Sequence, residues 1–245
     1  MAYEEVQLGL FEPVPEEAPE LWQVRRSKRA RRIAIHILPH GGVEIVAPHR
    51  APPDSVREFV EQQTEWIENS RNEMLKNIEA QGPLLPEVVE LKAIGRNIEV
   101  HYDIGEKPTY SMQADRLAVR APDITPTDVW PVLKRWLREL GRKHIPPLLQ
   151  KQSEVTGLSP ARVQIRNQKT RWGSCSSNRT ISLNAAILLL EPEQADYVLI
   201  HELCHLTHMN HSERYWGLVM QYVPEFRALD RAVDQFWETG PAWPR

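Results

Sequence analysis

The 245-residue sequence is poor in several features that would define a special class of protein. Two cysteines, Cys175 and Cys204, are too few for a disulfide framework, and eleven glycines exclude a collagen-like repeat. The longest apolar run, Ala185–Leu190, is far shorter than the roughly 20 residues that cross a bilayer. The first 20 residues are acidic and lack the basic and apolar regions of a signal peptide. We therefore expect a cytoplasmic protein with no membrane partner.

The composition is that of an ordinary folded chain, with 41% hydrophobic and 26% charged residues. The net charge is −3, but six of the 33 acidic residues lie within residues 1–22, which contain no lysine or arginine. The rest of the chain therefore has 30 basic and 27 acidic residues. Basic residues concentrate in Arg25–Arg32 and Arg162–Arg179. Both a solvated face and a surface for DNA or nucleotides fit these two segments.

Hydrophobic patterning predicts an α+β protein with a β-rich N-terminal half and a helical C-terminal half. We expect a disordered acidic tail over residues 1–22, because this segment has no hydrophobic periodicity. A β-rich region with one long helix is expected over 23–122, followed by a zincin-like catalytic region over 123–240.

Two β-hairpins and five helices are expected within these regions. Residues 32–38 and 43–47 alternate around Gly41-Gly42, and a second hairpin is predicted around Gly95. The helices are expected at residues 52–78, 128–155, 191–208, 216–223 and 226–236.

The third of these helices contains the motif His201-Glu202-Leu203-Cys204-His205. Histidines at positions i and i+4 lie on one helix face, so both imidazoles can reach one zinc ion at about 2.0–2.1 Å. Glu202 then lies beside the ion, where its carboxylate can take a proton from bound water. Zinc lowers the pKa of that water to about 7. The motif therefore predicts a zinc-dependent hydrolase with Glu202 as its general base.

A third zinc ligand is expected downstream of the motif. His208 is seven residues after His201, about 10 Å further along a continuous helix, which is too far for both to bind one ion. His211 becomes available if the chain turns at Met209–Asn210, since Asn tolerates the left-handed conformation and caps helices. The spacing from Asn210 to Glu213 also fits a capping box for the next helix. We therefore favour His211 over His208.

Other ligand sets remain open. Glu213 or Glu225 could supply a glutamate ligand from a following helix. A structural rather than catalytic zinc would require a fourth protein ligand, for which Cys175 or Cys204 is available. Cys204 occupies a motif position that should point away from the ion.

Several segments together resemble the YgjP-like metallopeptidases, a family of the zincin group that is related to the SprT-like proteins. They are Lys169–Ser176, Ile181–Asn184, His201–His205, Asn210–Ser212 and Tyr215-Trp216. The resemblance covers about residues 24–238. It implies a zincin fold, a Zn²⁺ ion bound by His201, His205 and His211, Glu202 as general base, and a peptide or protein substrate.

The resemblance also implies strands beside the cleft at residues 162–166 and 181–184, where an extended substrate would pair. Arg171 and Asn184 would then face the site, or else Arg171 packs locally and Asn184 caps the loop before the helix. Arg171 and Tyr215 are the candidate donors to the oxyanion.

Two other functions remain alternatives. A nucleoside-triphosphate pyrophosphatase activity has been attributed to a member of the family, and a metal site flanked by arginines would suit that reaction. The sequence has neither a Walker-type glycine loop nor a carboxylate cluster for magnesium, so peptidase is favoured. The other alternative is a non-catalytic module that binds zinc or nucleic acid.

The N-terminal tail contains a separate motif, Gln7-Leu8-Gly9-Leu10-Phe11. It resembles the short peptide with which bacterial replication and repair proteins dock on the sliding clamp. Gln7, Leu8, Leu10 and Phe11 would be the contacting residues, because apolar side chains in a polar tail have no neighbours of their own to pack against. The alternative is that they pack on the body of this same protein.

Overall fold

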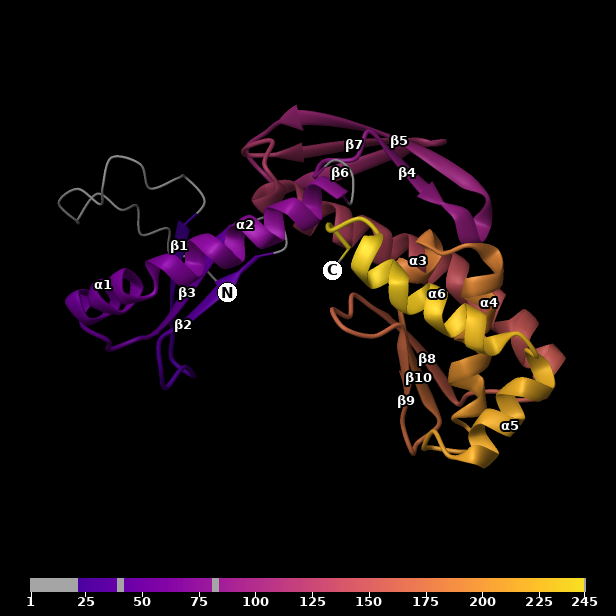
Figure 1. Cartoon of the computed structure of the whole chain (residues 1–245). Coiled ribbons are helices and arrows are strands. Elements are labelled where there is room, and N and C mark those ends of the chain that lie inside the picture. Colours follow the sequence, from indigo (N-terminus) through magenta and orange to yellow (C-terminus); the bar gives the residue numbers. More distant parts are fainter. Residues whose placement is uncertain (1–21, 39–41, 81–83, 245) are drawn as a thin grey trace. The chain divides into compact units, whose positions relative to one another are not determined.

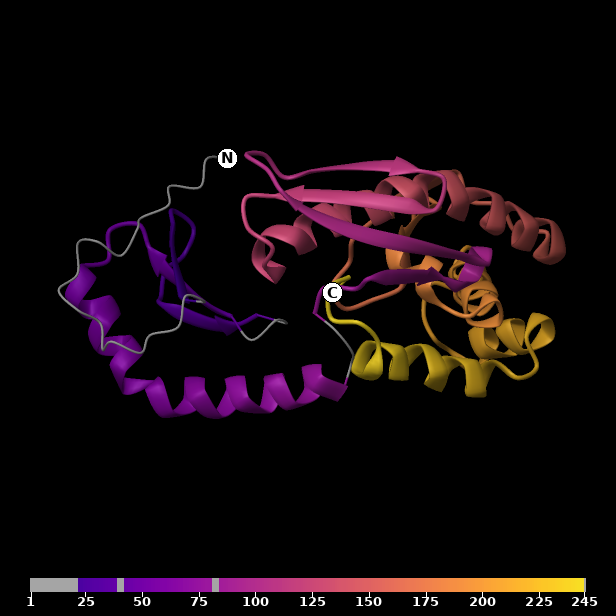
Figure 2. The ribbon, with the colours of Figure 1, turned by 90° about the horizontal axis from the view of Figure 1, so that it is seen from above.

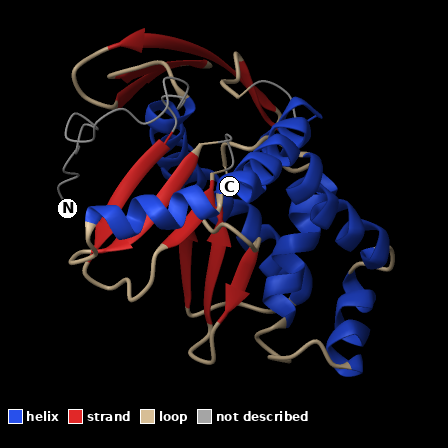
Figure 3. Cartoon of the chain, turned by 60° about the vertical axis from the view of Figure 1, so that its left-hand side comes forward, coloured by secondary structure: helices blue, strands red, loops and turns tan. Residues whose placement is uncertain are grey.

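The structure, a computed structural model, describes residues 22–38, 42–80 and 84–244. The chain divides into two compact units, residues 1–80 and 81–245. Helices and strands occur in both units, which confirms the α+β class (Figure 3). None of the helices in the described part of the chain combines the length and the apolar character that a bilayer crossing needs.

The first unit is a three-stranded sheet with two helices (Figure 1). Its elements are β1 (Trp22–Ser27), β2 (Ala34–Ile37), β3 (Val43–Pro48), α1 (Pro53–Gln62) and α2 (Thr64–Ala80). The strand order is β1-β3-β2, with β1 parallel and β2 antiparallel to β3, so the predicted hairpin is confirmed. The single helix predicted at 52–78 is instead two helices separated at Gln63. A small core that includes Ile45, Val56 and Ile67 holds the unit together.

The second unit begins with a four-stranded sheet of order β4-β5-β7-β6. Its strands are β4 (Val88–Leu91), β5 (Arg96–Ile104), β6 (Thr109–Gln113) and β7 (Arg116–Ala121), with the 3₁₀ turn η1 (Lys92–Ile94) between β4 and β5. Figure 2 shows the sheet running alongside the long helix α3 (Pro126–Thr156). Trp130, Leu133 and Trp136 of α3 belong to the same buried core as this sheet. The compact units therefore do not follow the division expected at residue 122, because the sheet packs with the helical half.

A second sheet, a 3₁₀ helix and three α-helices complete this unit. They are β8 (Arg162–Arg166), β9 (Gly173–Cys175), β10 (Thr180–Asn184), the 3₁₀ helix η2 (Ala185–Leu189), α4 (Pro192–Cys204), α5 (Glu213–Tyr222) and α6 (Phe226–Thr239). In Figure 1 the strands lie side by side in the order β8-β10-β9. The short strand β9 is therefore an edge strand, and the sequence pattern did not predict it.

The ends of α4 and the start of α5 are defined by local hydrogen bonds. Glu191 and Gln194 form a capping box at the start of α4, with Pro192 in its first turn. The helix ends at Cys204, four residues before the predicted end. Ser212, not Asn210, caps α5, because the Ser212 side chain accepts the Tyr215 backbone N–H.

Candidate metal centre

Three histidine side chains converge at the end of α4. His201 and His205 come from α4 and its C-cap, and His211 comes from the loop before α5. The potential ligand atoms all lie within 4.8 Å of one another, and the Nε2 atoms of His201 and His211 are 3.2 Å apart. Two nitrogen ligands of a tetrahedral zinc ion lie about 3.3 Å apart. The cluster therefore has the donor set and spacing that suit a zinc ion.

The early end of α4 explains how His211 reaches the other two imidazoles. After Cys204 the chain makes a tight turn, in which the backbone N–H of His208 bonds to the Cys204 carbonyl. The His208 carbonyl in turn lies 3.0 Å from Nδ1 of His205. A proton on Nδ1, donated to that carbonyl, leaves Nε2 of His205 free to bind a metal. His208 therefore contributes its backbone, while its imidazole is not part of the cluster.

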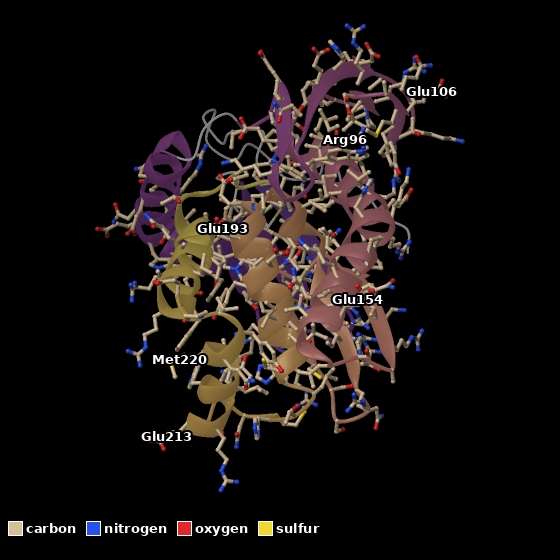
Figure 4. All side chains as sticks on the ribbon, turned by 90° about the vertical axis from the view of Figure 1, so that its right-hand side faces the viewer. Arg96, Glu106, Glu154, Glu193, Glu213 and Met220 are labelled. Carbon is tan, nitrogen blue, oxygen red and sulfur yellow. The ribbon has the colours of Figure 1, made fainter. Side chains whose placement is uncertain are left out.

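The glutamates considered as alternative ligands also lie outside the cluster. Glu213 is exposed in the first turn of α5, and Figure 4 shows its side chain at the outer surface, directed away from the fold. Glu225 is an exposed residue that precedes α6. Among the described residues, only the three histidines form a group that could hold a metal.

Two further side chains, linked by hydrogen bonds, orient the His201 imidazole. Its Nδ1 atom lies 3.4 Å from the Tyr197 hydroxyl, which donates a hydrogen bond of 2.6 Å to Asp230 on α6. Burial, followed by the neighbouring imidazoles of His205 and His211, lowers the pKa of His201 to about 3. His201 is therefore neutral at physiological pH, which is the form that binds metals.

Glu202 lies beside the histidines in a nearly closed environment. Its side chain is buried, and Oε2 has no hydrogen-bond partner among the residues that the structure describes. Burial raises the pKa of the Glu202 carboxyl to about 8, and the Arg171 guanidinium acts in the opposite direction. A buried carboxyl group without a partner is unusual unless it has a chemical role.

The backbone of β9 passes directly over this carboxyl group. A Cβ atom added at Gly173 would lie 2.5 Å from Oε1 of Glu202 and 2.6 Å from its Cδ. Only glycine therefore allows β9 to approach the glutamate so closely.

The two residues expected to donate to an oxyanion lie in different environments. Tyr215 is fully buried; its ring stacks on His205 at 4.4 Å, and its hydroxyl donates to the His201 carbonyl at 3.1 Å. Arg171 is exposed in the loop before β9, and its charge acts on Glu202. Of the two, only Arg171 has a side chain that is not already committed to the protein interior.

A family model described as "YgjP-like, metallopeptidase domain" matches residues 31–236. The chain belongs to the YgjP-like family. The comparison with curated proteins found no match.

Two solved structures are similar to parts of this YgjP-like chain. The metallopeptidase zymogen abylysin of Pyrococcus abyssi is 30% identical, with a TM-score of 0.35, and the match covers 39% of this chain and 98% of that one. The metallopeptidase zymogen jannalysin of Methanocaldococcus jannaschii is 19% identical, with a TM-score of 0.34, over 37% of this chain and 88% of that one.

Asn184 of the YgjP-like domain organises the loop before β9 and does not face the site. Its side chain is buried, donates to the carbonyls of Gln168 (2.7 Å) and Arg171 (3.0 Å), and accepts from the Ala186 N–H. The indole of the neighbouring Trp172 packs against α6 and donates to the Val233 carbonyl. The capping role considered for Asn184 is therefore confirmed.

Tyr197 and Asp230 are site residues that the sequence patterns did not predict. Tyr197 precedes His201 by four residues and so lies on the same helix face, a spacing that could have identified it. Asp230 is distant in sequence, and no local pattern connects it to the motif.

Two other sequence predictions concern residues outside the cluster. Cys204 is fully buried, with a pKa raised to about 12 by burial, and Cys175 is half-buried on β9. Neither belongs to the histidine group. Gln7–Phe11 lie outside the described residues, so docking on a sliding clamp stays a prediction.

Proposed function

We propose that this YgjP-like protein is a zinc-dependent peptidase in which His201, His205 and His211 hold the metal and Glu202 is the general base. The observation that carries the proposal is the convergence of three imidazoles next to a buried carboxyl group without a partner. A bound zinc ion would supply Lewis acidity and a lowered pKa for water at the site.

Glu202 would take the proton from the attacking water and pass it to the leaving amine. Its oxygen Oε2 is available for this transfer because no group in the described part of the chain binds it. A carboxyl group whose pKa is raised towards neutrality can both accept and release a proton at physiological pH. The positive charge of a bound zinc ion would act against burial and favour the ionised carboxylate, which is the form that accepts the proton.

The edge strand β9 would hold the substrate. The Trp172 carbonyl accepts the Asn184 backbone N–H, and the Ser176 N–H donates to the Thr180 carbonyl. Backbone groups alternate in direction along an antiparallel strand, so those of Gly173 and Cys175 point to the outer edge of the sheet. An extended peptide could pair with these groups beside Glu202. This arrangement favours a peptide over a nucleoside triphosphate. The strands expected beside the cleft, β8 and β10, occupy the far edge and the centre of the sheet.

Arg171 and Tyr215 would have different roles in the reaction. Arg171 would stabilise the oxyanion, because it is exposed and close enough for its charge to act on Glu202. We propose a structural role for Tyr215, because its hydroxyl is used by the His201 carbonyl.

Replacing His211 with alanine should remove most of the zinc from the purified protein. The wild-type protein is expected to contain nearly one zinc per chain, measured by plasma mass spectrometry, and the variant far less, since two histidines bind zinc weakly. His208→Ala is the matched control, because only the backbone of His208 contacts the site. Full zinc retention in His211→Ala would exclude His211 as a ligand.

Asp230→Ala should weaken zinc binding by about 10- to 100-fold, because it removes the end of the chain that orients His201. Competition with a chromogenic chelator would measure the affinity. Tyr197→Phe should have a similar effect, and the double variant should be little worse than either single one. Glu193→Ala, which removes an exposed carboxylate from the same helix, is the control (Figure 4). If Asp230→Ala, Tyr197→Phe and the double variant bind zinc as tightly as the control, the proposed chain of side chains is excluded.

A panel of peptides and casein, tested beside a panel of nucleoside triphosphates, separates the two hydrolase functions. Cleavage of a peptide that is lost in Glu202→Gln supports the proposal. Release of pyrophosphate from a nucleotide, lost in the same variant, would replace peptidase by pyrophosphohydrolase at this site.

A further inference from the structure

The first unit carries a group of unpaired cationic side chains far from the metal centre in sequence. Four of them, Lys28, Arg29, Arg31 and Arg32, lie in the connection between β1 and β2, and Arg50 follows β3. All five are exposed, and no acidic side chain in the described residues pairs with any of them. We call these five residues the basic surface.

The two backbone segments of the basic surface are fixed to each other. The backbone N–H of His49 donates to the Ser27 carbonyl at 3.1 Å, and the Arg26 guanidinium donates to the Pro48 carbonyl at 3.3 Å. The Ser27 hydroxyl also accepts the backbone N–H groups of Arg29 and Ala30, which holds the turn after β1. The basic surface is therefore displayed by an ordered part of the fold.

Acidic residues are scarce in the segments that carry the basic surface. Between Arg26 and Pro53 the sequence contains a single acid, Glu44, and its carboxylate is already paired with Arg25 at 2.8 Å. The other acids of this unit's described residues lie on its helices: Asp54, Glu58, Glu61, Glu65, Glu68, Glu73 and Glu79. Residues 25–50 therefore carry seven lysines and arginines and one acid, although the whole chain has a net charge of −3.

We propose that the basic surface binds the phosphate backbone of a nucleic acid. Four of its five residues are arginines, whose planar guanidinium groups can bind phosphate oxygens through two hydrogen bonds. Residues 26–32 and 48–51 contain no large apolar side chain that could enter a lipid bilayer, which favours a nucleic acid over an anionic membrane. They also contain no Phe, Trp or Tyr on which bases could stack, so binding should depend little on base sequence. The proposal does not depend on peptidase activity.

Fluorescence anisotropy of the full-length protein with a labelled duplex of about 30 base pairs would test this surface. The affinity should fall as salt rises from about 50 to 200 mM, because binding releases counterions. The triple variant Arg29→Gln/Arg31→Gln/Arg32→Gln should bind at least about 10-fold more weakly at low salt. The slope of log K against log salt should fall by about 0.9 for each lost phosphate contact, and so by about 2 to 3.

The matched control removes three exposed cations from the second unit, in Lys107→Gln/Lys143→Gln/Lys151→Gln. It changes the net charge equally but should retain most of the affinity and the slope. Thermal melting would verify that both variants are folded. Equal losses in the two triple variants, or no duplex binding by the wild type, would overturn the proposal. Binding to anionic phosphatidylserine vesicles without binding to duplex would also overturn it, in favour of a membrane surface.

Discussion

Glu202→Gln is expected to lower kcat by about 10²- to 10⁴-fold while the zinc content stays near that of the wild-type protein. Glutamine has nearly the same shape but cannot accept the proton from water. Zinc should be retained, because the cluster that could hold a metal consists of the three histidines and does not include Glu202. Steady-state cleavage of a peptide substrate, with metal analysis of the same preparations, would measure both quantities.

The control for this variant is Glu193→Gln, which changes an exposed glutamate at the other end of α4. It should leave kcat and zinc content unchanged. Loss of zinc from Glu202→Gln would mean that the carboxylate binds or positions the metal. Unchanged turnover with zinc retained would exclude Glu202 as the general base and leave the binding-module alternative.

The elements that the sequence predicted are those whose signal is local. The hairpin around Gly95 and the long helix α3 carry their own turn residue or apolar periodicity. Strand β9 has no such signal, because Gly-Ser-Cys has neither alternation nor high β propensity. It is a strand because it pairs with β10, so its recognition requires the tertiary structure. Strand β1 similarly depends on its parallel pairing with β3.

The residues of the candidate site also divide into those with a local sequence signal and those that depend on tertiary packing. The spacing of His201 and His205 follows from helix geometry, and the distance of His208 along a helix favoured His211. The details of the turn were wrong, because Asn210 is neither left-handed nor the cap of α5. The contact between Tyr197 and Asp230 depends on how α6 packs against α4, and the sequence contains no pattern for that packing. Tyr215 was expected to donate to the substrate, but a donor can be assigned only when the partner of its hydroxyl is known.

Gly173→Ala is expected to lower kcat/KM by about 10²-fold or more, with zinc retained. The added Cβ would lie 2.5 Å from Oε1 of Glu202, so one of the two groups must move. The carboxyl group is the end of a flexible side chain, whereas Gly173 is held in β9 by its pairing with β10. We therefore expect the catalytic carboxylate to be displaced. The free energy of unfolding should fall by only about 1 to 3 kcal/mol, as for other overpacked sites.

The matched control is Gly217→Ala on α5, where an added Cβ meets no atom of the described residues within 4 Å. It should retain full activity and gain about 0.5–1 kcal/mol of stability, because alanine favours a helix. A double-mutant cycle then tests the mechanism of the loss. If Gly173→Ala acts by displacing the carboxylate, adding Glu202→Gln should lower kcat/KM little further. Fully additive losses would instead mean that Gly173 acts on the substrate through the edge of β9, independently of the general base.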